Sequence, residues 1–199
     1  MSDNITINNT IAVEPHPLEP FLPEGARILM LGSFPPQRKR WSMEFFYPNP
    51  QNDMWKLMGL LFEGNKECFR RGKGFDKERI AAFCAERGIA LYDTASEVRR
   101  LKDNASDKFL EIVTRTDIAA LLGRIPQCGA IVTTGQKATD VIVDMFGCSE
   151  PTIGSFTELN IGGRDVRFWR MPSTSRAYPI ALERKAESYR AMFEYEKLL

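Results

Sequence analysis

Short apolar runs alternate with amphipathic stretches from residue 23 to the end of the chain. Three of these runs, Ile28–Leu31, Ile89–Tyr92 and Ala130–Thr133, are continuous and short, which is typical of strands buried on both faces. Two later runs, Phe156–Ile161 and Asp165–Met171, flank the pair Gly162-Gly163. Because paired glycines suit a tight turn between strands, this arrangement predicts a β-hairpin.

The stretches between the strands have the spacing of helices. Apolar side chains recur at helical intervals from Met54 to Leu61, and Asn52 directly precedes them as a suitable N-cap. Gly88 and Gly147 stand where two other helices are expected to end. The predicted helices are Asp53–Phe62, Asp76–Arg87, Thr116–Leu122, Gln136–Phe146 and a long helix that Pro179 opens and that runs to the C-terminus.

Strands separated by helices favour one α/β domain with a largely parallel sheet over residues 23–199. Residues 1–22 are polar, rich in Asn and then in Pro, and they are predicted to form a flexible leader. The active crevice of such a sheet lies at the carboxyl ends of its strands, so the loops of interest follow Leu31, Tyr92, Thr133 and Met171. None of these loops contains G-x-x-x-x-G-K or G-x-G-x-x-G, which argues against ATP hydrolysis and dinucleotide binding.

Composition narrows the class of protein further. The formal net charge is +1, which argues against a protein that coats nucleic acid but leaves room for a local basic patch. Basic clusters occur at Arg38–Arg40, Arg70–Lys73, Arg99–Lys102 and Arg184–Lys185, and each taken singly is typical of a solvated surface. No apolar run reaches transmembrane length and no signal peptide is evident, so we expect a soluble, cytoplasmic protein without a membrane partner.

The cysteines and the single histidine of the chain do not favour a metal site or a mechanism based on histidine. The four cysteines, Cys68, Cys84, Cys128 and Cys148, are widely spaced and indicate reduced, mostly buried thiols rather than a metal site. The only histidine, His16, lies between prolines in the predicted leader. A Ser-His-Asp or Cys-His mechanism is therefore excluded unless His16 folds back onto the domain.

The strand-end loops, taken in order, resemble those of the uracil-DNA glycosylase superfamily. The likeness is nearest to its hypoxanthine-DNA glycosylase branch, followed by the mismatch-specific uracil-DNA glycosylases, and it covers most of residues 26–195. The residues that carry it are Leu31-Gly-Ser-Phe-Pro35, Phe46-Tyr-Pro-Asn-Pro-Gln-Asn-Asp-Met-Trp55, Gly88-Ile-Ala-Leu-Tyr-Asp93 with the following Arg99 to Asp107, Thr134-Gly-Gln-Lys-Ala138 and Pro172-Ser-Thr-Ser175.

This resemblance implies a three-layer α/β/α fold with a central four-stranded, largely parallel sheet. It also implies an enzyme of base excision repair that flips a deaminated base, uracil or hypoxanthine, out of DNA and hydrolyses its N-glycosidic bond. Such an enzyme needs no metal and no other cofactor, its partner is DNA that contains a damaged base, and we expect a monomer.

The resemblance assigns roles to individual residues. Asn52 and Asp93 are the candidate catalytic groups, Asn52 by holding a water and Asp93 as a general base or as an acceptor for the base edge. Tyr47 is placed to stack on the flipped base. The base-binding residues are predicted to be Gly32, Ser33, Phe34, Tyr47 and Asp93, and the DNA-binding residues Arg38, Lys39, Arg40, Pro172, Ser173, Thr174, Ser175 and Arg176.

Two departures from the family pattern leave alternatives open. Phe34 stands where several branches carry a catalytic Asp or Asn, and Met171 stands where several carry a histidine that stabilises the leaving base. Asn52 also has an ordinary role as a helix cap, and Asp93 as a partner of Arg99 or Arg100. The alternative functions are a nucleic-acid-binding protein of this fold that has lost catalysis, and a hydrolase of free nucleosides or nucleotides.

Overall fold

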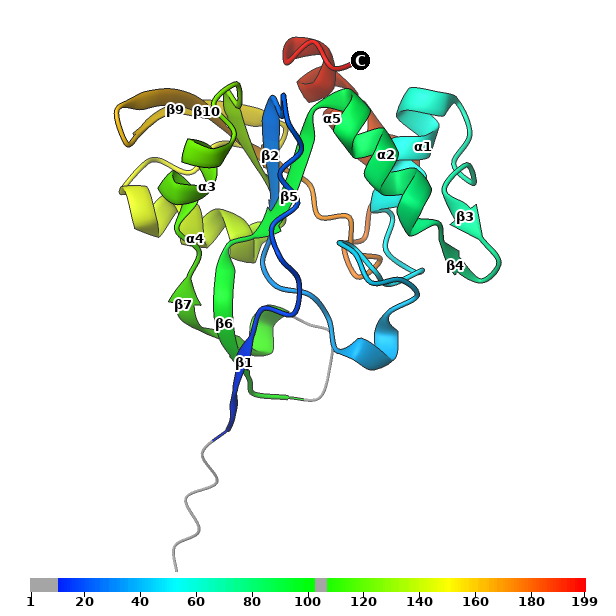
Figure 1. The fold of residues 1–199 in the computed structure, drawn as a ribbon, viewed down its shortest axis with the longest axis horizontal. Coiled ribbons are helices and arrows are strands. Elements are labelled where there is room, and N and C mark those ends of the chain that lie inside the picture. The colour runs from blue at the N-terminus through cyan, green and yellow to red at the C-terminus, as the bar shows by residue number, and fades with distance from the viewer. Residues whose placement is uncertain (1–10, 103–106) are drawn as a thin grey trace, which may run out of the picture.

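The computed structural model describes residues 11–102 and 107–199, and its central sheet has five strands in the order β5-β2-β8-β10-β9 (Figure 1). Four strands run parallel, namely β2 (Ile28–Gly32), β5 (Ile89–Asp93), β8 (Ala130–Thr134) and β10 (Arg164–Met171). The fifth, β9 (Ser155–Ile161), is antiparallel to β10 and forms the predicted hairpin with it. The predicted sheet had four strands and the observed sheet has five, because the first arm of the hairpin, β9, joins it as an edge strand.

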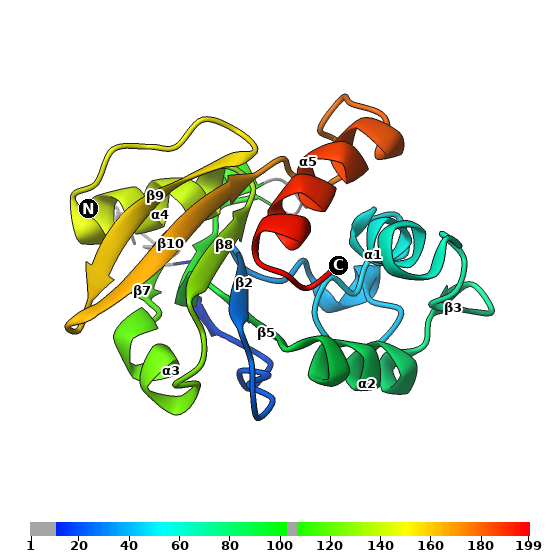
Figure 2. The ribbon, with the colours of Figure 1, turned by 90° about the horizontal axis from the view of Figure 1, so that it is seen from above.

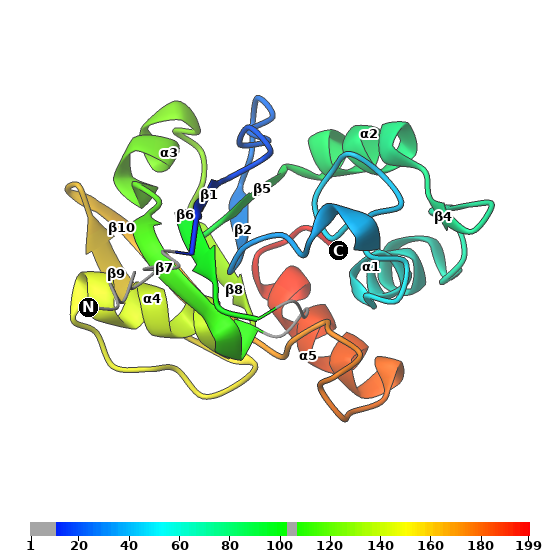
Figure 3. The ribbon, with the colours of Figure 1, turned by 90° about the horizontal axis from the view of Figure 1, so that it is seen from below.

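Helices cover both faces of the sheet. Figures 2 and 3 show α3 and α4 on one face and α1, α2 and α5 on the other, so the predicted three-layer α/β/α arrangement is confirmed. None of the helices in the described residues is long and apolar enough to cross a bilayer. The helices are α1 (Met54–Glu63), α2 (Lys77–Arg87), α3 (Ile118–Arg124), α4 (Gln136–Phe146) and α5 (Leu182–Tyr195).

The apolar runs of the sequence form the core. Every residue of β2, β5 and β8 is buried, as expected for strands covered on both faces. On the face covered by α1 and α5, the side chains of Trp55, Tyr189 and Phe193 are fully buried. Gly88 and Gly147 end α2 and α4 in the left-handed conformation, at φ +69° and +60°, so both predicted helix ends are confirmed.

Four helices begin later than the sequence predicts. The first helix begins at Met54 and not at Asp53, and α2 begins at Lys77 and not at Asp76. Helix α3 begins at Ile118, and α5 begins at Leu182, beyond Pro179. In α3 the reason is local, because Asp117 stands before the helix and its carboxylate accepts a hydrogen bond from Ala120 N–H.

The fold also contains smaller elements that the sequence pattern did not predict. A second sheet has the order β1-β6-β7, formed by Val13–Pro15, Ala95–Arg100 and Leu110–Arg115. A short hairpin pairs β3 (Arg70–Arg71) with β4 (Gly74–Phe75). Two short 3₁₀ helices are η1 (Arg38–Arg40) and η2 (Asp107–Phe109).

The predicted flexible leader is packed against the domain where the structure describes it. Strand β1 pairs antiparallel with β6, and the backbones of Phe21 and Leu91 exchange two hydrogen bonds of 3.0 and 2.9 Å. Residues 11–22 therefore form part of the ordered fold, which corrects the prediction for this stretch. Residues 1–10 of the predicted leader lie outside the described residues.

Candidate active site

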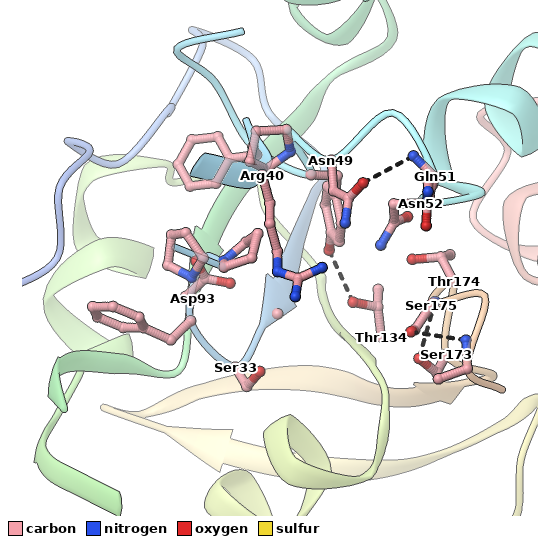
Figure 4. Close-up of a pocket in the computed structure, with 18 of the residues that line it drawn as sticks. Ser33, Arg40, Asn49, Gln51, Asn52, Asp93, Thr134, Ser173, Thr174 and Ser175 are labelled. Carbon is pink, nitrogen blue, oxygen red and sulfur yellow. Dashed lines mark hydrogen bonds between the residues drawn. The ribbon is translucent and has the colours of Figure 1, made fainter. Parts of the chain in front are cut away.

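A pocket of about 620 Å³ opens at the carboxyl ends of the parallel strands, where the α/β pattern places an active crevice (Figure 4). Its walls come from the loops after β2 and β10, the last residues of β5 and β8, and the segment that leads into α1, with one residue each from β6 and η2. Of the residues predicted for the site, those that line the pocket are Gly32, Ser33, Phe34, Arg40, Tyr47, Asn52, Asp93, Ser173, Thr174, Ser175 and Arg176.

Gly32 and Asp93 lie side by side at the ends of β2 and β5, where they are register partners. Asp93 is 7% exposed, and its Oδ2 lies 2.9 Å from Nε2 of His16. Its Oδ1 lies so close to Gly32 that a Cβ atom added to this glycine would stand 2.3 Å from that oxygen. The absence of a side chain at Gly32 is therefore what makes room for the carboxylate.

Replacing Gly32 by alanine is expected to destabilise the protein by about 1–3 kcal/mol, the usual cost of forcing an extra methyl group into a packed site. The backbone of Gly32 is not in the left-handed region, so the contact with Asp93 accounts for the effect. Gly123→Ala is the matched control, because a Cβ at this glycine of α3 meets no atom within 4 Å. Urea unfolding of both variants checks the prediction, and equal stability of the two would contradict it.

Tyr47 forms part of the pocket wall. Its hydroxyl lies 2.9 Å from Oγ1 of Thr134, and its ring packs edge-on against Trp55 at 6.0 Å between centroids. Burial raises the pKa of the Tyr47 phenol, so the hydroxyl stays protonated at neutral pH. Tyr47 also has φ +49°, a strained conformation for a residue with a side chain, and such residues cluster at functional sites. Its stacking on a base remains a prediction.

The N-cap position of α1 is held by Asp53 and not, as predicted, by Asn52, which lies one residue earlier and lines the pocket. The Oδ1 of Asn52 accepts a hydrogen bond of 2.9 Å from Met54 N–H, which orients the amide nitrogen toward the pocket (Figure 4). Asn49 repeats this arrangement, since its Oδ1 accepts from Gln51 N–H at 2.9 Å. The sequence did not single out Asn49, although it lies between two prolines only three residues before Asn52. Both amides offer the pocket N–H donors.

The loop after β10 contributes hydroxyl groups to the pocket. Backbone N–H groups donate to the hydroxyl oxygens of Ser173 and Ser175, each at 3.2 Å, which leaves the hydroxyl hydrogens able to donate to a ligand. Thr174 lines the pocket but is 1% exposed. Pro172 does not line it, and its carbonyl accepts a hydrogen bond from Tyr189 Oη. Pro172 therefore supports the loop from below.

A buried ion pair holds this loop against the start of α1. The ammonium group of Lys185, 0% exposed, lies 2.9 Å from Asp53 Oδ2 and 3.0 Å from the carbonyl oxygen of Ser175. The N–H group of Asp53 donates to the carbonyl of Thr174 at 2.9 Å. The prediction that Lys185 belongs to a solvated basic cluster was wrong, because this lysine joins α5 to two walls of the pocket.

Cationic side chains gather along the pocket. Arg40, Arg100, Lys108 and Arg176 all contribute to its lining, and Asp93 is the one carboxylate among the described residues that line it. Arg100 belongs to a basic cluster of the sequence, whereas no sequence signal pointed to Lys108. Arg100 also donates to Glu14 at 3.1 Å and to the carbonyl of Pro35 at 3.2 Å, so its guanidinium is held in place.

The two other basic residues of the predicted DNA-binding group lie outside this pocket. Arg38 is exposed, forms an ion pair with Glu44 and stacks over the ring of Trp41 at 4.1 Å. Lys39 lines a smaller adjoining hollow together with Arg40 and Trp41. The indole N–H of Trp41 donates to the carbonyl of Pro36, which itself lines the main pocket. This basic turn therefore forms the outer rim.

The two departures from the family pattern are packing positions. Phe34 is buried in a small cluster with Ala95, Val98 and Leu110, and Met171 is 1% exposed in the main core. Neither offers a group that can take part in acid–base chemistry. His16 folds back onto the domain, which the sequence analysis left open, and it reaches the site through Asp93.

No group of three or more His, Cys, Asp or Glu side chains is arranged to hold a metal ion within the described part of the chain. The thiols of Cys68, Cys84 and Cys128 are buried, and burial raises the pKa of Cys128 to about 11. These cysteines accordingly have the character of core residues rather than of nucleophiles.

Among solved structures, the chain is similar to the solution NMR structure described as a "putative Uracil DNA glycosylase" from Methanosarcina acetivorans. The TM-score is 0.64 at 19% sequence identity, and the match covers 94% of this chain and 99% of that chain. Comparison with protein-family models and with curated proteins gives no match. At this identity the likeness shows that the two chains share a fold.

Proposed function

We propose that this protein is a monofunctional DNA glycosylase that flips uracil or hypoxanthine out of DNA and hydrolyses its N-glycosidic bond, as in base excision repair. The observation that carries the proposal is the composition of the pocket. Its interior has hydrogen-bonding groups suited to a base edge, and its opening is lined by cationic side chains and serine hydroxyls. The shared fold with a protein described as a "putative Uracil DNA glycosylase" supports it.

The interior of the pocket suits a flipped base. Enzymes that extrude a base read its exposed edge by hydrogen bonds and hold it by stacking. Tyr47 and Phe46 supply aromatic surface, Asn49 and Asn52 supply N–H donors for carbonyl oxygens, and Asp93 supplies an acceptor for a ring N–H. Uracil and hypoxanthine both carry a ring N–H beside a carbonyl, which matches donors and an acceptor in one pocket.

The mouth of the pocket suits the phosphates on either side of that base. Phosphate contacts in protein–DNA complexes come from Arg, Lys, Ser and Thr side chains, and they position the nucleic acid without reading its sequence. Arg40 and Arg176 are exposed lining residues, and Ser173 and Ser175 lie on the same loop as Arg176. A polymer substrate explains this concentration of donors better than a free nucleoside does, since a nucleoside carries no phosphate.

The reaction breaks the bond between C1′ and the base nitrogen, and the bonding electrons leave with the base. Water then adds to the oxocarbenium-like sugar and gives up a proton, which leaves an abasic site. The amide of Asn52 is a donor that can stabilise the departing base. Two roles are open to Asp93, as an acceptor for the ring N–H of the base or as the group that takes the proton from water.

The decisive experiment incubates the protein with end-labelled duplexes that contain uracil, hypoxanthine, xanthine or no damaged base, followed by alkali. We expect alkali-sensitive strands from a deaminated base and none from the undamaged duplex. Binding to DNA should weaken steeply with salt, because neutralised phosphates release counterions. Salt-dependent binding without strand breaks on any duplex would favour a binding protein that has lost catalysis. Release of bases from free nucleosides, without salt-dependent DNA binding, would favour a nucleoside hydrolase.

A further inference from the structure

The single histidine of the chain lies directly behind the carboxylate of the pocket, and we infer that His16 is a positioning residue for Asp93. His16 is not among the lining residues, so it acts through Asp93 and does not touch a molecule in the pocket. The effect of His16 on catalysis rests on the proposed glycosylase function, whereas its effect on the geometry of Asp93 does not.

The segment that carries His16 is attached on both sides of it. Before it, β1 pairs with β6, and His16 N–H itself donates to the carbonyl of Ser96 at 2.8 Å. After it, Phe21 forms its two backbone hydrogen bonds with Leu91 on β5. The imidazole between these attachments is 3% exposed. Polar groups that are buried in this way are normally hydrogen-bonded.

Each nitrogen of the imidazole has such a partner. Nε2 lies 2.9 Å from Asp93 Oδ2, while Nδ1 lies 2.7 Å from the carbonyl oxygen and 3.2 Å from the nitrogen of Leu18. With Nε2–H donating to Asp93, Nδ1 either accepts from Leu18 N–H or, in the imidazolium, donates to the Leu18 carbonyl. Leu18 can therefore satisfy Nδ1 in either form without disturbing the bond to Asp93.

Aromatic rings fix the plane of the imidazole. Its centroid lies 4.5 Å from that of Tyr92 and 5.2 Å from that of Phe34, the latter at an edge-to-face angle of 77°. Phe34 thus has a function where it departs from the family pattern, since its ring supports the histidine that supports Asp93. The ring that stands in place of the family's catalytic acid therefore packs against the histidine that is bonded to Asp93.

The two carboxylate oxygens of Asp93 therefore have different surroundings. His16 holds Oδ2, while Oδ1 lies against Gly32 and makes no hydrogen bond to any described residue. The last torsion of an aspartate side chain is broad, so without His16 the carboxylate would sample orientations that turn Oδ1 away. His16 thereby keeps Oδ1 presented to the base or to water.

Nuclear magnetic resonance tests the geometry without any need for activity. The protein, purified without a histidine tag, has one imidazole, so its ¹⁵N and ¹H signals need no assignment among residues. We expect a proton on Nε2 that exchanges slowly with water, and we expect Asp93→Ala to change its shift and speed its exchange. An unprotonated Nε2, or signals that are the same in both proteins, would overturn the inference.

Paired substitutions test the effect on catalysis. His16→Leu should lower kcat by about 10–100-fold, the scale expected for a misplaced reacting group, with KM for DNA unchanged because the rim is intact. His16→Gln, whose amide N–H can replace Nε2–H, should recover most of the rate. Thermal unfolding verifies that both variants are folded at the assay temperature.

A folded His16→Leu protein with normal kcat, or a His16→Gln protein as slow as His16→Leu, would overturn the catalytic effect. An inactive wild-type protein would instead reject the proposed function and leave the resonance experiment to decide the geometry.

Discussion

Changing Asp93 to asparagine is expected to lower the rate of base release by about 100-fold or more, the lower end of what a positioned acid or base contributes. The variant keeps the size of the side chain in the tight space beside Gly32, so the loss reports the carboxylate and not its packing. Single-turnover rates on each damaged duplex measure it. Both roles of Asp93 predict a loss on uracil, hypoxanthine and xanthine alike, because all three bases carry a ring N–H, and an unchanged rate on all of them would reject both roles.

The companion variant is Asn52→Asp. A carboxylate oxygen still accepts from Met54 N–H, so the start of α1 is retained while the N–H donor that faces the pocket is lost. Removal of one donor that stabilises a developing negative charge costs about 10²–10³-fold in kcat, and we expect a loss of this size. If both variants remain as active as the unaltered protein, neither residue is the essential group.

Lys185→Met is expected to have the largest effect on stability. It removes the cation from a fully buried position and leaves the Asp53 carboxylate without its nearest partner, a change that typically costs about 3–5 kcal/mol. Lys56 lies 3.6 Å from the other oxygen of Asp53 and compensates in part, so a value near the lower end, about 3 kcal/mol, is expected. The free energy of unfolding in urea measures it.

Arg184→Met is the matched control for this substitution. Arg184 is the preceding residue of the same helix, its side chain is 74% exposed, and its ion pair with Glu187 is on the surface. Such pairs contribute little, so the change should remain within about 0.5 kcal/mol. Replacing Asp53 by leucine in the Lys185→Met protein should restore part of the stability, because the uncompensated charge is gone. Equal unfolding free energies for Lys185→Met and Arg184→Met would show that the buried pair does not hold the two segments together.

The central sheet was predictable because its signals are local. The strands β2, β5 and β8 are continuous apolar runs, and the glycines that follow α2 and α4 end those helices in the structure. The position of the pocket followed from the parallel sheet. The second sheet was not predictable in this way, because β6 mixes charged and apolar residues and has register shifts between Ala95 and Val98 that break strict alternation.

The parts of the site that the sequence did not predict depend on contacts between distant residues. His16 and Asp93 are 77 residues apart, and Asp53 and Lys185 are 132 apart. In the local pattern His16 belongs to a Pro-rich segment and Lys185 to the polar face of an amphipathic helix. Only the folded structure shows that His16 and Lys185 each contact a carboxylate. Asn52 lies between these cases, since the sequence predicted a pocket residue, which the structure shows, and an N-cap, which is Asp53 instead.

The position of Trp41 has a spectroscopic consequence. Of the three tryptophans of the chain, Trp55 and Trp169 are buried in the core, while Trp41 is half-buried on the basic turn and bonded to a residue of the pocket wall. DNA that settles on this turn would displace the Arg38 guanidinium from the indole face or change its hydration. Changes in the emission of the unlabelled protein on adding DNA would then arise at the rim, so fluorescence could follow the arrival of a duplex separately from the chemical step.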